Sequence, residues 1–125
     1  MKSNIPQRID LACRQLASRR GFYRLTVDEL AREAGISKRT LYRYYRSKEA
    51  IIEATLDAFT TEVLADIDDL LLRENDPVLL LKSALELLAH KGSFIINPAS
   101  MYDLEKYYPQ LWQKIDQLRI ERIKQ

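Results

Sequence analysis

The pattern of apolar and polar positions along this chain is helical. Over about residues 4–20, apolar side chains recur every three or four positions, which is the spacing of one helix face: Ile9, Ala12, Cys13, Leu16 and Ala17. Gly21 follows this stretch and suits the left-handed backbone position that ends many helices. No β-hairpin dipeptide or sustained two-residue alternation occurs in the sequence. The fold class is therefore predicted to be all-α.

Two shorter helices are predicted next, with a glycine between them. Thr26 and the glutamate three residues later have the spacing of a capping box, which predicts a helix over about residues 26–34. Gly35 supplies a tight bend, and Ser37 is a good N-cap for a third helix that runs to about Tyr45. Two short helices around a glycine turn are the layout of a helix-turn-helix.

The rest of the chain is predicted to form one long helix and three shorter ones. Apolar positions keep helical spacing from Ser47 until Asn75, the first breaker. Proline and glycine then mark the bounds of the later helices, at Asp76-Pro77, Gly92, Asn97-Pro98 and Pro109. The last helix is amphipathic, with Leu111, Ile115 and Leu118 on one face. We predict two domains: a three-helix head over residues 1–47 and a helical body over residues 48–125.

Charge divides the chain at the same place. Up to Lys48 the sequence has twelve Lys/Arg and four Asp/Glu, a net charge of +8, whereas the remainder has eight and fourteen, a net charge of −6. Such an asymmetry is typical of a nucleic-acid-facing region joined to a body with another role.

Composition excludes several other classes. A single cysteine, Cys13, cannot form an internal disulfide, and with a single histidine, His90, there is no zinc-ligand set, so we expect no metal and no cofactor. The longest apolar run, residues 78–81, is far too short to span a bilayer, and the N-terminus has no apolar block of signal-peptide length. We expect no membrane association and a cytoplasmic location.

Five cations and three tyrosines crowd residues 38–48. On a helical wheel, Leu41 and Tyr45 face the core, whereas Tyr42 lies on the opposite side with Arg39, Arg43 and Arg46. A helix end of this kind can enter a major groove, where Lys38, Arg39 and Thr40 would contact base edges. The flanking tyrosine hydroxyls suit phosphate oxygens, as does Lys48 at the start of the long helix.

The segment LTVDELAREAGISKRTLYRYYRSKEAIIEA, residues 25–54, resembles the DNA-binding signature of the TetR/AcrR family of bacterial transcription regulators. The resemblance implies an all-helical homodimer that binds a double-stranded DNA operator through three N-terminal helices. It also implies a larger domain whose small-molecule ligand loosens DNA binding, most often in a repressor. The family's phosphate-contacting positions fall on Thr26, Tyr42, Tyr44 and Lys48, and its base-reading positions fall on Lys38, Arg39, Thr40 and Arg43. Many members have a small residue where this chain has Arg39.

The ligand of such a regulator would be a small apolar or amphipathic molecule. Candidate pocket residues are the aromatic and methionine side chains of the body: Phe59, Phe94, Met101, Tyr102, Tyr107, Tyr108 and Trp112. Aromatic and methionine residues at helical spacing are, however, more often part of a packed core than of a pocket. Family members normally have nine or more helices, whereas seven are predicted here. We therefore expect the body to be incomplete at its C-terminus, and we expect the homodimer in the full-length form.

Two other functions are compatible with parts of the pattern. A clustered tyrosine could be the nucleophile of a DNA strand-transfer enzyme, but the basic partners all lie on one short helix and His90 is the sole histidine. A helical adaptor for an acidic protein surface or RNA would not need the glycine-turn spacing. A ligand-responsive DNA-binding regulator without enzyme activity is the favoured interpretation.

Overall fold

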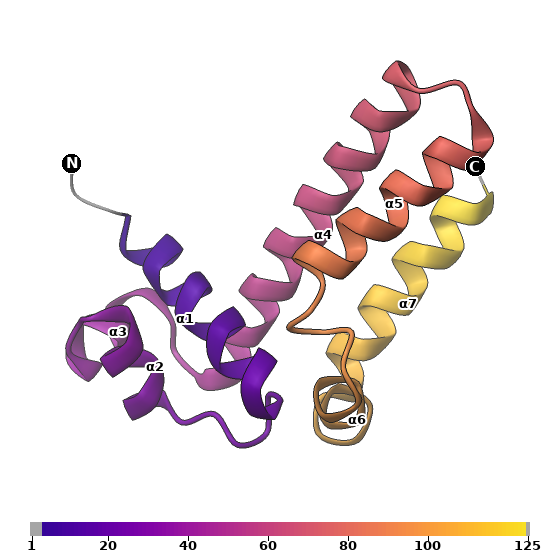
Figure 1. The fold of residues 1–125 in the computed structure, drawn as a ribbon. Coiled ribbons are helices and arrows are strands. Elements are labelled where there is room, and N and C mark those ends of the chain that lie inside the picture. Colours follow the sequence, from indigo (N-terminus) through magenta and orange to yellow (C-terminus); the bar gives the residue numbers. More distant parts are fainter. Residues whose placement is uncertain (1–3, 125) are drawn as a thin grey trace.

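The computed structural model describes the backbone of residues 4–124 and the side chains of residues 4–117. This part of the chain holds seven helices and no strand, which confirms the all-α prediction (Figure 1). The helices are α1 (Ile5–Arg20), α2 (Val27–Ala34), α3 (Lys38–Tyr44), α4 (Lys48–Arg73), α5 (Pro77–Lys91), α6 (Pro98–Tyr107) and α7 (Pro109–Lys124). The side chain of Leu118, predicted on the apolar face of α7, lies outside the described side chains.

Side-chain caps explain where most of the helices begin. The side chain of the N-cap residue accepts a hydrogen bond from a backbone N–H in the first turn of five helices, at the predicted caps Thr26 and Ser37 and also at Ser47, Asp76 and Asn97. Such a bond satisfies one of the amide groups that a helix start leaves without a partner.

The head, α1 to α3, packs around the predicted apolar faces. Ile9, Cys13, Leu30 and Leu41 are each at most 1% exposed, and the start of α4 adds Ile52 to the same cluster. Ile36 and Tyr45 are partly buried against this core, which for Tyr45 agrees with the helical wheel. Burial of the Tyr45 ring raises the pKa of its hydroxyl.

The body is built on the long helix α4. One face of its first half is buried, whereas the apolar residues Ile67 and Leu70 in its second half are only half-buried. Helix α5 runs back along α4 and α7 lies beside them, with Nζ of Lys114 3.0 Å from Oδ1 of Asp57 on α4 (Figure 1). None of the residues of α5 is buried.

Helix α6 joins the body to the head. The Ser100 hydroxyl donates to the Ala17 carbonyl oxygen at 3.3 Å, and Oδ2 of Asp103 accepts from the backbone N–H of Tyr23 at 3.0 Å. Gly21 lies at this contact and ends α1, with its N–H donating to the Ala17 carbonyl oxygen. Its φ of 82° is positive as expected, but its ψ of −179° lies outside the left-handed helical region, so that part of the prediction is wrong. The positive φ still requires glycine. One core cluster runs across the boundary predicted after residue 47.

Candidate nucleic-acid interface

The turn between α2 and α3 fixes the position of the candidate reading helix. Gly35 has φ 72° and ψ 34°, which is the left-handed region that the sequence predicts. The N–H of Gly35 donates to the Arg32 carbonyl oxygen at 3.1 Å, and the N–H of Ile36 donates to the Ala31 carbonyl oxygen at 3.0 Å. These two bonds form a Schellman motif, which satisfies the carbonyl groups at the end of α2.

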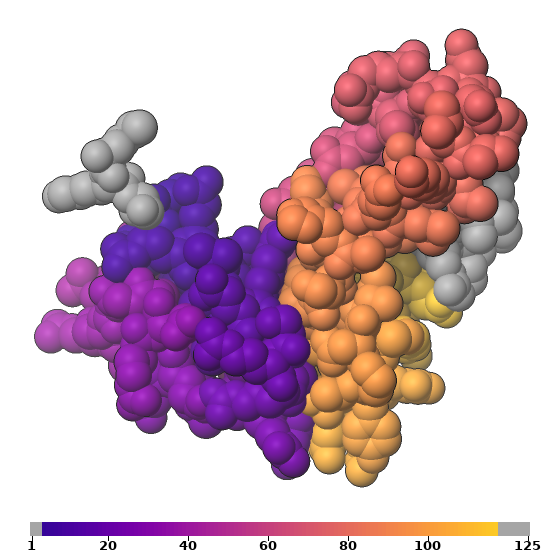
Figure 2. Space-filling view, in the orientation of Figure 1, coloured from indigo at the N-terminus to yellow at the C-terminus, as the bar shows by residue number. Residues whose placement is uncertain are grey.

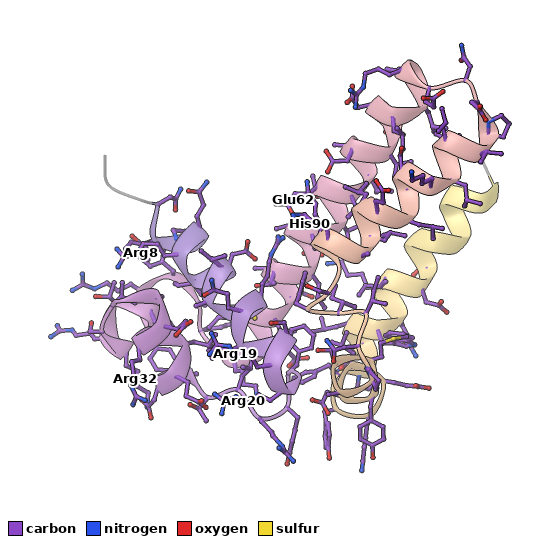
Figure 3. The ribbon with its side chains drawn as sticks, in the orientation of Figure 1. Arg8, Arg19, Arg20, Arg32, Glu62 and His90 are labelled. Atoms are coloured by element: carbon purple, nitrogen blue, oxygen red, sulfur yellow. The ribbon has the colours of Figure 1, made fainter. Side chains whose placement is uncertain are left out.

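A side chain that sequence reasoning missed also holds this turn. Nε of Arg8, on α1, donates to the Ala34 carbonyl at 2.9 Å, and Nη2 donates to the Gly35 carbonyl at 2.9 Å. Figure 3 shows Arg8 on α1 beside α2 and α3. The contact places a cation at the negative end of the α2 dipole and ties the turn to α1. Helical spacing carries no signal for a bond between residues so distant in sequence.

Helix α3 presents the predicted basic face to solvent. Leu41 is fully buried beneath it, whereas Arg39, Tyr42, Arg43 and Tyr44 are exposed. Within residues 4–117, neither Arg39 nor Arg43 forms an ion pair. Nζ of Lys38 lies 3.3 Å from Oδ1 of Asp28, and both side chains are more than half exposed. An exposed pair of this kind contributes at most about 1 kcal/mol, so Lys38 can exchange it for another acceptor.

The two threonines of the predicted interface are engaged in capping. The Thr26 hydroxyl accepts from the Glu29 N–H at 3.1 Å and donates to Oε1 of Glu29 at 3.0 Å. Thr40 is half-buried, and its Oγ1 accepts from the Ser37 hydroxyl at 2.9 Å. Thr40 is therefore less accessible than Lys38 at the same end of α3.

Lys48 lies at the start of α4, where the head meets α6. Its Nζ donates to the Tyr23 carbonyl at 2.7 Å and lies 5.7 Å from the Tyr23 ring and 5.9 Å from the Tyr108 ring. Partial burial in this surrounding lowers the pKa of Lys48. Because an ammonium group has three donors and Tyr23 takes one, the side chain can still contact a phosphate.

The seven candidate ligand-pocket residues occupy different environments. Phe94 is buried, with its ring edge-on to Phe59 at a centroid distance of 5.2 Å. Phe59 is partly buried against the core, and so are Tyr108 and Trp112. The other three side chains are exposed: Met101, Tyr102 and Tyr107. Phe94 also lines an open groove of about 310 Å³ between α1 and the end of α5.

Among the residues that the structure describes, no three or more His, Cys, Asp and Glu side chains gather in a way that could hold a metal ion. No helix in this part combines the length and the apolar character needed to cross a membrane.

Comparison with known proteins identifies the fold. Residues 10–55 match the model of "Bacterial regulatory proteins, tetR family", which covers all of α2 and α3, most of α1 and the start of α4. Residues 10–55 are therefore similar to the DNA-binding segment of the TetR family. A crystal structure of a transcriptional regulator from Cytophaga hutchinsonii superposes with a TM-score of 0.71 at 22% identity, over 93% of this chain and 60% of that one.

Curated relatives extend the TetR-family match. The HTH-type transcriptional regulator YvaF of Bacillus subtilis is 32% identical over 104 residues, which is 82% of this chain and 53% of YvaF. MftR of Mycobacterium tuberculosis, named as a regulator of mycofactocin biosynthesis, is 46% identical over 50 residues, 40% of this chain and 25% of MftR. The chain therefore spans about half the length of YvaF.

Proposed function

We propose that this chain is the DNA-binding part of a transcriptional regulator that reads a double-stranded operator with α3. The observation that carries the proposal is the outward basic face of α3: Leu41 anchors the helix in the core while Arg39 and Arg43 stay exposed and without an ion pair in the described part of the chain. Unpaired guanidinium groups on an exposed helix face are suited to guanine acceptors in a major groove.

The proposal divides the side chains into two kinds. Base contacts are assigned to Lys38, Arg39, Thr40 and Arg43, with Thr40 the least accessible of them. Phosphate contacts are assigned to Thr26, Tyr42, Tyr44 and Lys48. Tyr42 and Tyr44 are 46% and 49% exposed, so their hydroxyl groups are available to a DNA backbone beside α3.

The test begins with selection of a preferred duplex from a random pool, followed by fluorescence anisotropy on the selected sequence. Arg39→Ala should weaken binding to that duplex by about 1–3 kcal/mol, roughly 5- to 150-fold, and broaden the base preference. Arg73→Ala is the matched control, because it removes an exposed arginine at the far end of α4. If no sequence is enriched over the random pool, the proposed function is wrong.

The regulatory part of the proposal concerns the helical body. We infer a homodimeric repressor that a small apolar or amphipathic ligand releases from DNA, with the seven candidate residues of the body contributing to the ligand site. Support comes from the partial burial of Phe59, Tyr108 and Trp112 against the core that the body shares with the head. A thermal-shift screen of apolar acids and amphipathic amines on the protein, followed by anisotropy with the selected duplex, would identify a ligand. A hit that stabilises the protein without releasing DNA would contradict this part.

For the strand-transfer alternative, the relevant experiment is incubation with supercoiled DNA and a search for a covalent tyrosyl adduct. A regulator of the proposed kind leaves the DNA intact and forms no adduct.

A further inference from the structure

A group of tyrosine and lysine side chains lies outside the helix-turn-helix, where α6 meets the head. Its members are Tyr23, Lys48, Tyr102, Lys106 and Tyr107, which we call the tyrosine-lysine patch. In Figure 3, side chains of α6 and of the segment that follows α1 emerge from the same lower edge of the molecule. The space-filling view shows α6 directly against the end of the head at this edge (Figure 2).

The members of the patch are joined by direct contacts. The Tyr107 ring stacks on the Tyr23 ring at a centroid distance of 3.8 Å and an interplanar angle of 16°. The Tyr23 carbonyl in turn holds Nζ of Lys48 at 2.7 Å. A continuous surface therefore leads from Lys48, at the N-terminus of α4, to α6 of the body.

Lys106 is the cation at the α6 end of this surface. Its Nζ donates to the Tyr102 hydroxyl at 2.9 Å and lies 5.2 Å and 5.3 Å from the ring centroids of Tyr102 and Tyr107. The Tyr102 hydroxyl raises the pKa of Lys106, so the ammonium group stays charged. Within residues 4–117 no carboxylate forms an ion pair with it.

The acidic residues of α6 do not cancel this charge. Asp103 is 8% exposed, and its carboxylate is turned inward to the N–H of Tyr23. Glu105 is exposed and adjacent in sequence, but successive helical residues point about 100° apart. The Lys106 ammonium group and the tyrosine hydroxyl beside it can both donate hydrogen bonds, and phosphate oxygens accept such bonds.

We propose that the tyrosine-lysine patch is a second DNA-backbone contact, in which Lys106 of the body binds a phosphate beyond the one contacted by Lys48. This inference rests on the proposed function, because it assigns the same DNA a longer footprint. Duplex DNA is the fitting partner because the patch continues from a lysine at a helix N-terminus in the head, whose net charge is strongly positive. The contact adds affinity without reading sequence.

The test measures the salt dependence of binding to the selected duplex for wild type, Lys106→Ala, Lys106→Arg and Lys82→Ala. The logarithm of the association constant falls linearly with the logarithm of the salt concentration, and loss of one phosphate contact makes this slope about 0.9 less steep. Raising the salt from 50 to 200 mM should therefore weaken binding of the variant about threefold less than it weakens binding of wild type. Lys106→Ala should show this change, Lys106→Arg should restore the wild-type slope, and Lys82→Ala, an exposed lysine on α5, should leave it unchanged. All three side-chain changes are at exposed positions, and circular dichroism checks that each variant is folded.

A second measurement locates the contact. Phosphate-ethylation interference should show at least one phosphate whose ethylation weakens binding of wild type but not of Lys106→Ala. Selection from the random pool should return the same base sequence for both proteins. An unchanged slope together with an unchanged interference pattern overturns the patch and leaves the α3 assignment intact. Failure of the wild-type chain to enrich any sequence would instead overturn the proposed function itself.

Discussion

Replacing Arg8 with alanine tests whether α1 holds the helix-turn-helix turn in solution. The substitution removes two charge-assisted hydrogen bonds of 2.9 Å, to the carbonyl groups of Ala34 and Gly35. The bond to Ala34 is partly buried, and such a bond contributes about 1.5–3 kcal/mol. The bond to Gly35 is exposed, so water can replace it at little net cost.

The loss of the cation at the end of α2 adds a further cost of about 0.3–1 kcal/mol through the helix dipole. Together these contributions predict that Arg8→Ala lowers the free energy of unfolding by about 2–4 kcal/mol. Urea denaturation followed by circular dichroism measures this change directly. Because the turn orients α3, anisotropy should also show that affinity for the selected duplex falls more than affinity for random DNA.

Arg46→Ala is the matched control for Arg8→Ala. Arg46 is an exposed arginine of the head, so its removal changes the charge equally without touching the turn. Its effect on stability should stay within about 0.5 kcal/mol of zero. If Arg8→Ala were no more destabilising than Arg46→Ala, the contact between Arg8 and the turn would not exist in solution and the reasoning would fail.

Three further predictions concern the core and the contact between head and body. Gly21→Ala should destabilise the fold by about 3 kcal/mol in urea, because the positive φ is strained for a residue with a Cβ and because this Cβ would press on the Ala99 backbone and Oδ2 of Asp103; wild-type stability would refute the contact. Burial raises the pKa of Asp10 in the folded state, so its ionised form costs stability near neutral pH and this cost disappears as the carboxyl is protonated. The stability of Asp10→Asn relative to wild type should therefore be greater at pH 7 than at pH 4, and a difference independent of pH would contradict the shift. Cys13 is fully buried and burial raises its pKa to about 12, so a thiol reagent at pH 8 should modify it only as fast as the chain unfolds; reaction at the rate of a free thiol would show that the core is open.

The helices and the outward face of α3 could be predicted because both depend on local spacing. Apolar residues three or four positions apart define the buried side of a helix, and this places Leu41 inward and Arg39 outward without any knowledge of tertiary contacts. The N-caps Thr26 and Ser37 follow from equally local chemistry, since their side chains bond an amide group within the same turn.

The contacts between helices could not be predicted in this way. Arg8 reaches carbonyl groups 26 and 27 residues away, and Asp103 accepts from the N–H of Tyr23 80 residues away. No periodicity within one helix encodes such pairs. At Gly21 the positive φ was predicted but the ψ was not, and the close approach of Asp103 and Ala99 of α6 to this glycine is likewise a contact between distant residues.

The central claim is that α3 lies in the major groove and reads base edges there. Dimethyl sulfate methylation of guanine N7 on the selected duplex tests this claim most directly, because N7 is accessible only from the major groove. The account predicts that wild type protects at least one guanine N7 and that Arg39→Ala loses this protection while Arg73→Ala retains it. Binding of the selected duplex with every guanine N7 fully reactive, or protection that Arg39→Ala leaves unchanged, would contradict it.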